Sequence, residues 1–450
     1  MRVKTADLLS DSFENFLGVK QGEPLSPLLF LFSINDLIED MNISPSADIV
    51  NINEVLIYLI LFADDTILFG KSPEILQELL DKLLIYCNKW NIEVNINKTK
   101  VVVFKNGWQP VTAKFFYNNE ELEIVDSYIY LGMLIHCNGK ILKTQKRLAL
   151  QGSRSLAALN NSTNGLYLTK KKKCDLFDSM VASVINYASE IWGFHRGNDV
   201  EIIHNRFCRS ILKLGKSTPN VFLYGELGRL PMNVIRKQKV LKYWLKIVTH
   251  KPLIVYDIYI LLLRDANTGK TNWVSNVRDL LFSIGLNFVW YQQSGINISL
   301  DVIKTRLKDQ YIQSWSASIQ DCEKLTMYRI LKLDFCFEDY VDYNYNSHFF
   351  TKLRSGTMKL NVEVGRYTNI LRENRLCTCC NMKSVEDEYH FTLVCPVYRH
   401  VRLQFLPNYY CSWPNVTKLM YLYQTKSRSL VGKLCNYLKS AWQIRSHLIS

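Results

Sequence analysis

The sequence predicts an α+β protein, with strands and helices alternating in the first third of the chain and helices dominating the rest. Up to about residue 135, short apolar runs alternate with segments whose apolar residues recur at helical spacing. From about residue 140 the helical pattern prevails. The third observation is a group of four cysteines between residues 377 and 395, which in a reducing compartment favours a metal site over disulfides.

The composition is that of a folded, basic protein. The 450 residues exceed one average domain, and 48% are hydrophobic, enough to bury sizeable cores and to exclude a disordered chain. Lys and Arg number 55 against 41 Asp and Glu, for a formal charge of +14. This excess is typical of proteins that bind nucleic acids, because phosphates attract basic surfaces. The charge alone is equally compatible with binding to an anionic membrane surface.

Two features predict an intracellular, soluble protein without a membrane partner. The N-terminal residues MRVKTAD contain no apolar signal core. The longest apolar run, residues 55–62, is too short to span a bilayer and is soon followed by two aspartates.

The first predicted elements surround these aspartates. Residues 24–41 are expected to form a helix, because proline is tolerated in a first turn. The β-branched, apolar run at residues 55–61 predicts a strand buried on both faces. The chain breaks at Asp64 and Asp65 and resumes as a strand at residues 66–69, so both carboxylates are expected at the tip of a hairpin.

Further elements follow along the chain. Ser72 is expected to cap a helix with Pro73 at its first position, followed by apolar residues at helical spacing. Residues 101–104 and 128–135 are expected to be strands. A basic run then opens a helical segment with four lysines: Lys170, Lys171, Lys172 and Lys173.

Adjacent carboxylates at a hairpin tip are costly unless a cation neutralises them, and Mg²⁺ prefers such hard oxygen ligands. Two such ions about 3.5–4 Å apart can activate a hydroxyl and stabilise a leaving pyrophosphate. Alone, an Asp–Asp pair is more often a polar turn. An earlier segment at residues 18–30 (GVKQGEPLSPLLF) adds glycines that permit close approach to a ligand and a helix N-terminus that favours phosphate. By itself, this segment is also consistent with an ordinary glycine turn before a helix.

Taken together, these segments resemble the reverse transcriptases of non-LTR (LINE-type) retrotransposons. The matching segments are residues 18–30 with motif B, residues 62–65 (FADD) with motif C, residues 95–100 (NINKTK) with motif D and residues 128–132 (YIYLG) with motif E, the primer grip. Their order and spacing, and Ala63 rather than Met before the aspartates, indicate the non-LTR branch. The resemblance implies an RNA-directed DNA polymerase.

The resemblance assigns the metal and nucleotide roles. Asp64 is expected to bind the catalytic Mg²⁺, with Asp65 as a supporting carboxylate. Gln21 and Gly22 are expected to line the site of the incoming nucleotide and its template base. Lys98 is expected to act near the triphosphate as a general acid. An ordinary solvated lysine is the alternative for Lys98.

The primer terminus is expected to be held by Leu131 and Gly132. The implied partners are an RNA template, a DNA primer and deoxynucleoside triphosphates, and the implied compartment is the nucleus. The four lysines at 170–173 are expected to contact the template–primer backbone. A solvated helix start explains the same lysines equally well.

The resemblance also divides the chain into regions. Residues 1–138 are expected to be a partial palm carrying motifs B to E. Helical regions are expected to follow: a thumb at 139–215, a connection at 216–370 and a tail at 406–450. Between the connection and the tail, residues 371–405 are expected to form a zinc knuckle.

The zinc prediction rests first on spacing. Cys377, Cys380, His390 and Cys395 follow the pattern C-x2-C and then H-x4-C. Three thiolates and one imidazole make a closed tetrahedral Zn²⁺ site of the structural type. The segment also resembles the zinc-binding segment near the end of many non-LTR reverse transcriptases. Cys379 is an alternative to Cys380 as a ligand, and a set of buried free thiols is the non-metal interpretation.

The resemblance further implies a third carboxylate, in motif A, some tens of residues before Gly18. Seventeen residues precede Gly18, and their acids are Asp7, Asp11 and Glu14, in a segment that resembles the hairpin just before motif B. The chain is therefore expected to start downstream of the first catalytic aspartate and to be inactive by itself. The alternative function is a non-catalytic, nucleic-acid-binding remnant built on the basic thumb and the zinc segment.

Overall fold

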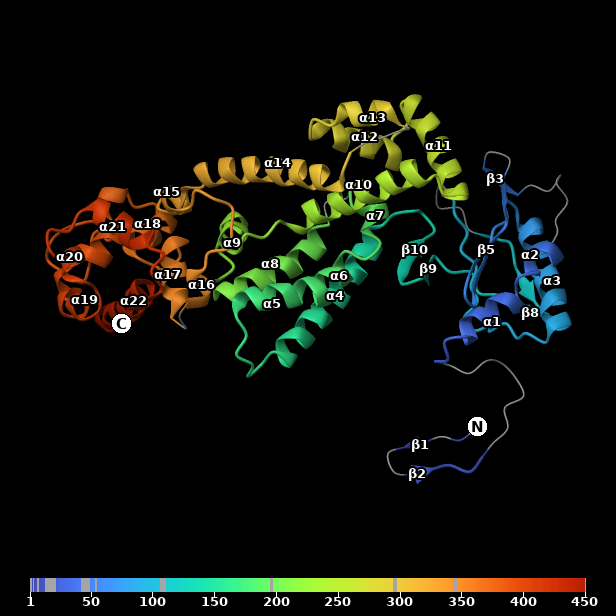
Figure 1. Cartoon of the computed structure of the whole chain (residues 1–450), viewed down its shortest axis with the longest axis horizontal. Helices are drawn as coiled ribbons and strands as arrows, with labels where there is room; N and C mark the ends of the chain where they lie inside the picture. The colour runs from blue at the N-terminus through green and yellow to red at the C-terminus, as the bar shows by residue number, and fades with distance from the viewer. Residues whose placement is uncertain are drawn as a thin grey trace. The chain divides into compact units, whose positions relative to one another are not determined.

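The alternation of strands and helices ends close to residue 140, and the chain divides there (Figure 1). The computed structural model describes residues 2, 4–5, 8–12, 22–41, 49–52, 55–105, 111–194, 197–293, 298–343 and 346–449. The N-terminal unit comprises Met1–Lys140 and Pro252–Thr268, and the helical unit comprises Ile141–Lys251 and Gly269–Ser450. Helices outnumber a few short strands, which is compatible with the predicted α+β class. The finer division into thumb, connection, knuckle and tail stays a prediction.

In the described part of the N-terminal unit, the strands pair as antiparallel hairpins of two strands each. The hairpins are β1 (Lys4–Thr5) with β2 (Leu8–Leu9), β3 (Val50–Ile52) with β4 (Val55–Ile57), β5 (Leu59–Phe62) with β6 (Asp65–Leu68), β7 (Phe116–Tyr117) with β8 (Glu120–Glu121), and β9 (Ser127–Tyr130) with β10 (Met133–His136). The helices are α1 (Ser26–Ser33), α2 (Leu37–Asp40), α3 (Pro73–Trp90) and α11 (Leu253–Asn267). α11 contacts β3, although it is distant in sequence.

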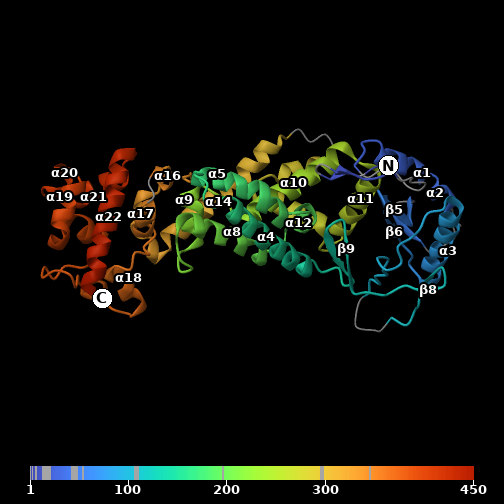
Figure 2. The ribbon, with the colours of Figure 1, turned by 90° about the horizontal axis from the view of Figure 1, so that it is seen from below.

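Helix α3 contributes to two hydrophobic cores of this unit and packs beside β6 (Figure 2). It begins as predicted, because the Ser72 side chain accepts a hydrogen bond from the Ile75 N–H and Pro73 occupies the first turn. One side of the helix buries Leu79 and Cys87 against α2 and the β5–β6 hairpin. Leu80 is buried in a second core with residues around β7 and β8. The helix therefore joins two small cores.

The predicted helix at 24–41 is wrong in one respect, since it breaks into α1 and α2. The Leu37 N–H bonds the Ile34 carbonyl at 3.1 Å, which leaves the Ser33 carbonyl without its usual helical donor. The Tyr86 hydroxyl on α3 donates to that carbonyl at 3.2 Å and approaches an Asp36 carboxylate oxygen at 2.6 Å. A side chain from α3 thus supplies the hydrogen bond that the Ser33 carbonyl lacks within the helix.

Three strand predictions are corrected. The expected strand at 55–61 is interrupted at Tyr58, so β4 and β5 pair with different partners. It is not buried on both faces, because Ile60 and Phe62 are 42% and 59% exposed. At 101–104 only Val101 forms a bridge, with Ile124. Residues 128–135 form the β9–β10 hairpin rather than one strand.

The helical unit is organised by its long helices. α4 (Leu142–Ser162) packs against α8 (Asn198–Leu212), and α10 (Met232–His250) packs against α14 (Leu300–Gln320). α22 (Arg428–Ile449) packs against α17 (Ser347–Arg354) and α19 (Arg399–Phe405).

The remaining helical elements of this unit are α5 (Lys170–Phe177), η1 (Asp178–Ala182), α6 (Ser183–Ile185), α7 (Ser189–Trp192), α9 (Asn220–Leu227), α12 (Trp273–Ser283), α13 (Asn287–Gln292), η2 (Glu323–Leu325), α15 (Tyr328–Leu331), α16 (Tyr340–Tyr343), α18 (Asn361–Tyr367), η3 (Arg372–Asn374), η4 (His390–Val394), η5 (Pro396–Tyr398), α20 (Asn408–Cys411) and α21 (Val416–Tyr423). Among the helices that the structure describes, none combines the length and apolar character that crossing a bilayer requires.

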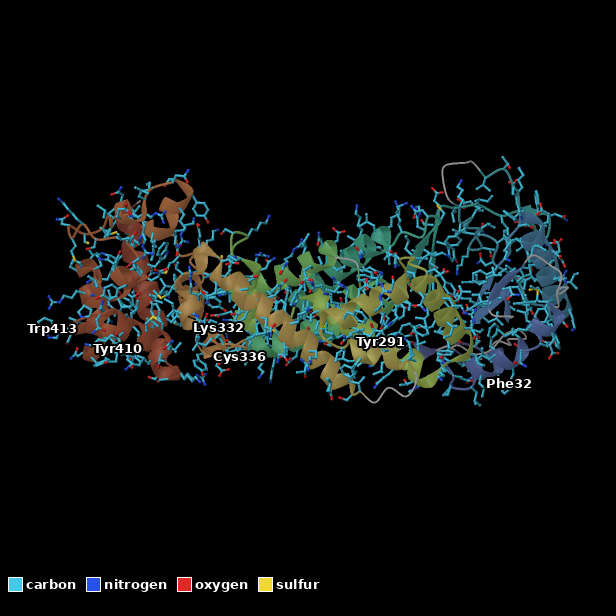
Figure 3. The ribbon with its side chains drawn as sticks, turned by 90° about the horizontal axis from the view of Figure 1, so that it is seen from above. Phe32, Tyr291, Lys332, Cys336, Tyr410 and Trp413 are labelled. Atoms are coloured by element: carbon cyan, nitrogen blue, oxygen red, sulfur yellow. The ribbon has the colours of Figure 1, made fainter. Side chains whose placement is uncertain are left out.

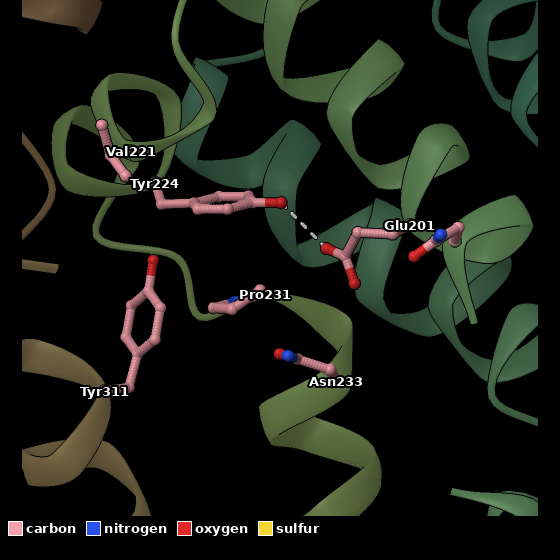
Figure 4. A pocket seen from close by; sticks show the side chains of 7 residues that line it. Glu201, Val221, Tyr224, Pro231, Asn233 and Tyr311 are labelled. Atoms are coloured by element: carbon pink, nitrogen blue, oxygen red, sulfur yellow. Dashed lines mark hydrogen bonds between the residues drawn. The ribbon is translucent and has the colours of Figure 1, made fainter. Parts of the chain in front are cut away.

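A cavity of about 420 Å³ in the helical unit is lined by Asn198, Glu201, Val221, Tyr224, Pro231, Asn233 and Tyr311 (Figure 4). Glu201 is the ionisable carboxylate in its wall. Its Oε1 accepts hydrogen bonds from the Tyr224 hydroxyl at 2.9 Å and from the Met232 N–H at 3.1 Å. These bonds tie α8 to α9 and to the start of α10, so the carboxylate has a structural role.

His204 lies next to this carboxylate and is completely buried. Arg229 Nε–H donates to His204 Nε2 at 3.1 Å, so that nitrogen must be unprotonated and Nδ1–H faces Glu201 Oε1 at 3.3 Å. Burial lowers the pKa of His204 from its usual 6.5, and the nearby Arg229 charge adds to this, although Glu201 opposes both. The folded protein therefore holds a neutral imidazole.

This neutral histidine predicts acid destabilisation of the helical unit. Below pH 6.5 the unfolded chain binds a proton that the folded state resists, so the free energy of unfolding should fall as the pH decreases. The slope from one such group is at most about 1.4 kcal/mol per pH unit. Denaturant titrations at several pH values between 5 and 7 give the free energy of unfolding at each pH. This free energy should change less with pH in His204→Gln than in the parent, whereas the exposed His400→Gln should match the parent. Parallel slopes for parent and His204→Gln would contradict the assignment.

Candidate active site and candidate metal centre

The two aspartates lie at the turn of the β5–β6 hairpin, as predicted. Phe62 pairs with Asp65, which leaves Ala63 and Asp64 as the two turn residues. Ala63 has a φ of 53°, a conformation that L residues rarely adopt and that marks a constrained turn. Both aspartates are exposed. The hairpin therefore presents two carboxylates to solvent on a short, apolar support.

Two exposed carboxylates can ligate one hard cation such as Mg²⁺, with water or substrate phosphates completing the shell. Among the described residues, no further acid, Cys or His has a ligand atom close enough to join Asp64 and Asp65 in a three-ligand site. The hairpin tip by itself therefore provides an incomplete site for two-metal chemistry.

The β9–β10 hairpin carries a tyrosine, Tyr130, whose ionisation is influenced by one of the aspartates. Burial raises the pKa of Tyr130, and the negative charge of Asp65 raises it further, so the hydroxyl lies within electrostatic range of that carboxylate. Next to Tyr130, Leu131 and Gly132 form the turn with φ values of 45° and 77°. Glycine suits this left-handed turn, whereas Leu131 is strained there. Leu131 and Gly132 therefore directly follow a side chain whose ionisation is influenced by Asp65, and their contact with a primer end stays a prediction.

Tyr130 is the member of this group that the motif comparison did not single out. Its signal in the sequence is an aromatic residue directly before the Leu-Gly turn, which places its side chain at the end of β9. Only the pairing of β9 with β10 and the folding of both strands near β6 bring the hydroxyl toward Asp65.

The other predicted active-site residues lie in exposed turns or outside the described residues. Gly22 lies in an exposed turn with a φ of 90°, where glycine is favoured, and Gln21 lies outside the described residues. Lys98 is exposed in a turn in which its N–H bonds the Asn95 side chain at 3.1 Å. None of the described ion pairs joins Lys98 to the aspartates. Its approach to a triphosphate remains a prediction.

The four lysines at the start of α5 are not equivalent. The Lys170 ammonium donates to the Val341 carbonyl and, at 2.9 Å, to the Ser347 hydroxyl. Burial lowers the pKa of Lys170 to about 8. Lys170 is therefore held inside the helical unit and fits a phosphate contact poorly. Lys171 and Lys172 are exposed and Lys173 is half-buried, so these three remain available.

The four predicted metal ligands converge. The ligand atoms of Cys377, Cys380, His390 and Cys395 all lie within 4.8 Å of one another. A tetrahedral zinc centre with Zn–S bonds of about 2.3 Å separates its sulfurs by about 3.8 Å, which is compatible with this spacing. His390 Nε2 lies 3.4 Å from Cys380 Sγ, so this nitrogen faces the cluster. The donor set and its spacing fit Zn²⁺.

Local structure positions these ligands. Cys377 is fixed by a hydrogen bond from its N–H to the Ser384 carbonyl at 2.8 Å, which closes the loop that carries Cys380. His390 and Cys395 stand at either end of η4, and the Cys395 N–H bonds the His390 carbonyl at 2.8 Å. Two elements, a loop and a helical turn, therefore each supply two ligands.

The alternative ligand Cys379 belongs to a second cluster, with Cys377 and Glu386. Both carboxylate oxygens of Glu386 already accept hydrogen bonds. The Arg445 guanidinium donates to them at 2.6 and 2.7 Å, and the Asn361 N–H donates at 2.8 Å. Such bidentate, charge-assisted bonds are strong in a buried setting. Cys380 is therefore the better fourth ligand, and Glu386 anchors the metal-binding segment to α22.

A family model and several known proteins match parts of the chain. A sequence profile of the family "Reverse transcriptase (RNA-dependent DNA polymerase)" matches residues 4–135. A transposon-derived protein of Caenorhabditis elegans is 30% identical over 138 residues, 30% of this chain and 48% of that protein. The Pol polyprotein from type-2 retrotransposable element R2DM of Drosophila melanogaster is 31% identical over 142 residues, 29% of this chain and 13% of the polyprotein.

An RNA-directed DNA polymerase from transposon BS of Drosophila melanogaster is 28% identical over 208 residues, 43% of this chain and 22% of that polymerase. The chain thus spans less than half the length of each of these relatives. The segment at residues 4–135 belongs to the reverse transcriptase family. This match and the transposon names of the relatives fit a LINE-type reverse transcriptase, which confirms the family expected from the motifs.

Proposed function

We propose that the N-terminal unit contributes the metal-binding hairpin of an RNA-directed DNA polymerase. One observation carries the proposal: Asp64 and Asp65 are exposed at a hairpin tip within a segment that matches the reverse transcriptase family. The turn at Leu131 and Gly132 supports it, because this turn directly follows Tyr130, whose pKa is raised by the Asp65 charge, and a primer terminus must lie next to the metal ligands.

In this proposal each residue has a separate role. Asp64 and Asp65 would hold Mg²⁺, which when bound supplies neutralisation of triphosphate charge. Gln21 and Gly22 would line the pocket for the incoming nucleotide and its template base. Lys98 would protonate the leaving pyrophosphate.

The turn at Leu131 and Gly132 would hold the primer end, so that its hydroxyl lies close to the aspartates. The substrates would be an RNA template, a DNA primer and deoxynucleoside triphosphates. An intracellular, nuclear protein is what the resemblance implies.

Primer extension tests this function. The polypeptide of residues 1–450 alone should give no detectable Mg²⁺-dependent incorporation on a primed RNA template, because no third carboxylate joins the pair among the described residues. Loss of even one electrostatic contact in an active site commonly costs about 10²- to 10³-fold in rate. Supplying the upstream segment of a close relative, fused or in trans, should permit extension, and Asp64→Ala with Asp65→Ala should abolish it.

Two outcomes would count against this account. Incorporation by residues 1–450 alone that disappears in the double alanine variant would reveal a substitute carboxylate. Absence of incorporation even with the added segment would favour the second candidate function, a non-catalytic nucleic-acid-binding remnant. That candidate is supported by the formal charge of +14 and by the exposed lysines at the start of α5.

If the lysines of α5 bind phosphates, the affinity for nucleic acid should depend on the salt concentration. Each phosphate contact should contribute about 0.7–0.9 to the slope of log affinity against log salt concentration. Replacing Lys171, Lys172 and Lys173 with alanine should therefore reduce the slope for an RNA–DNA hybrid, measured by fluorescence anisotropy. A control that removes three exposed lysines elsewhere in the helical unit (Lys242, Lys246 and Lys308) should change it less. Equal changes in both variants, or binding indifferent to salt, would refute a local contact at α5.

We also propose that the Cys/His cluster binds one structural Zn²⁺. Elemental analysis of purified protein should give about one zinc per chain, because three thiolates and an imidazole complete a tetrahedral shell. Cys395→Ser should lose the metal, whereas the half-buried Cys322→Ser, outside the cluster, should retain it. Chelation should increase hydrogen exchange around residues 377–395, because ligand binding and local folding are coupled. Unchanged zinc content in Cys395→Ser would exclude the site.

A further inference from the structure

The C-terminal part of the helical unit has an unusual charge distribution. Residues 389–450 contain eight Lys and Arg and not one Asp or Glu. Two of the cations are internal, since Arg402 donates to the Thr392 and Cys395 carbonyls and Arg445 binds Glu386. The other six are exposed or half-buried: Arg399, Lys418, Lys426, Arg428, Lys433 and Lys439. This surface is therefore positively charged and complementary to a polyanion.

Aromatic rings are also exposed in this segment. Tyr409 on α20, Trp413 after it and Tyr421 on α21 are 57%, 90% and 61% exposed, and we name these three residues the aromatic platform. Large apolar rings in contact with solvent are informative when they gather with polar neighbours, because they mark interaction surfaces. Figure 3 shows Trp413 projecting at the edge of the C-terminal helices, with Tyr410 nearby.

Lys418 joins the members of the platform. Its ammonium lies 4.5 Å from the centre of the Tyr409 ring and donates to the Ser412 carbonyl at 2.6 Å, directly before Trp413. Tyr421 is three residues further along α21, so it lies on the same side of that helix as Lys418. The Lys418 cation is thus fixed over one exposed ring and next to the residue that precedes a second.

The backbone holds Trp413 in a constrained state. Its φ of 50° lies in the left-handed region, which is unfavourable for a bulky residue and persists only where the surroundings enforce it. The Tyr389 hydroxyl enforces it in part, by donating to the Pro414 carbonyl at 2.9 Å. Burial is not the reason for this conformation, since the indole is exposed. Strain of this kind together with exposure favours a binding role over a packing role.

We propose that the aromatic platform, with Lys418, binds single-stranded nucleic acid by stacking unpaired bases on its rings. Rings combined with a basic groove are the way sequence-tolerant proteins hold single strands, because every base has a face that can stack. Paired bases in a duplex do not offer that face. The other five exposed or half-buried cations of this segment would contact the phosphate backbone. This site is separate from the polymerase residues and does not rest on the proposed function.

An anionic bilayer is the competing partner. An interfacial helix inserts an apolar face between lipids, with its charges on the opposite face. The apolar face of α21 is already used, because Leu419 and Leu422 are completely buried in the core of the unit. Of the three rings only Tyr421 lies on α21, and the buried face of this helix is not available to insert into a bilayer, which favours the nucleic acid.

Binding measurements on the full chain test the platform, without nucleotides or Mg²⁺ so that polymerase activity plays no part. The probes are labelled oligo(dT) and oligo(U) of about 20 nucleotides, longer than single-strand sites of this kind, and a duplex of equal length. Trp413→Asn removes the ring and keeps a residue that tolerates the left-handed conformation. Its affinity for both single strands should fall at least about five-fold, the loss expected for one stacked base. Trp413→Phe should retain most of the affinity.

Controls separate stacking from other effects. Tyr291→Asn removes a ring that is 71% exposed on α13 and should bind like the parent. Duplex affinity should be nearly the same in all variants. If Trp413→Asn does not fold, tryptophan fluorescence of the parent and of Trp413→Phe tests the proposal instead. Adding oligo(dT) should quench the fluorescence of the parent more than that of Trp413→Phe, because in the parent Trp413 itself would stack on a base.

Three results would overturn the proposal. The first is single-strand affinity that Trp413→Asn leaves unchanged, and the second is quenching equal in the parent and in Trp413→Phe. The third is loss of binding to phosphatidylserine vesicles in Trp413→Asn with oligonucleotide binding intact, which would assign the rings to a membrane surface instead.

Discussion

Three thiols and one imidazole within 4.8 Å of one another are the constraint on which the C-terminal part of the chain depends. A loop and the η4 turn meet at this cluster, and the segments that follow are fixed from there. Arg402 returns from α19 to the carbonyls of Thr392 and Cys395, and Arg445 returns from α22 to Glu386. Tyr389, the neighbour of His390, holds the Pro414 carbonyl. Because metal binding is coupled to the folding of the segments that supply the ligands, a metal at this centre would stabilise all of these contacts at once.

The two units carry opposite kinds of chemistry. The N-terminal unit exposes carboxylates, which suit a hard cation and the triphosphate that it neutralises. The helical unit exposes cations and rings, which suit a nucleic acid backbone and unpaired bases. A polymerase of the reverse transcriptase family requires both, since it must bind the template along its length and act at one phosphate. The exposed lysines of α5 and the C-terminal cations would supply the first requirement without any direct part in the chemistry.

The features that the sequence predicts well are local ones. The Ser72 cap, the hairpin at Asp64 and Asp65, and the spacing of the four metal ligands each depend on residues a few positions apart, and the structure has all three. The features that were missed depend on distant partners. Lys170 is half-buried and its ammonium bonds to Val341 and Ser347, and the helix at 24–41 breaks where Tyr86 reaches Ser33. No periodicity in the chain encodes such contacts. The expected strand at 101–104 failed for a related reason, because β pairing requires a partner and only Val101 has one.

Helix α11 belongs to the N-terminal unit although it is encoded in the middle of the helical one. During synthesis the ribosome delivers residues 1–140 first, yet β3 must wait for its contact with α11 until more than a hundred further residues have emerged. A recombinant fragment that ends at residue 140 would lack one of its own helices permanently. A usable fragment of this unit has to include α11, either through the natural connection or through a short designed linker.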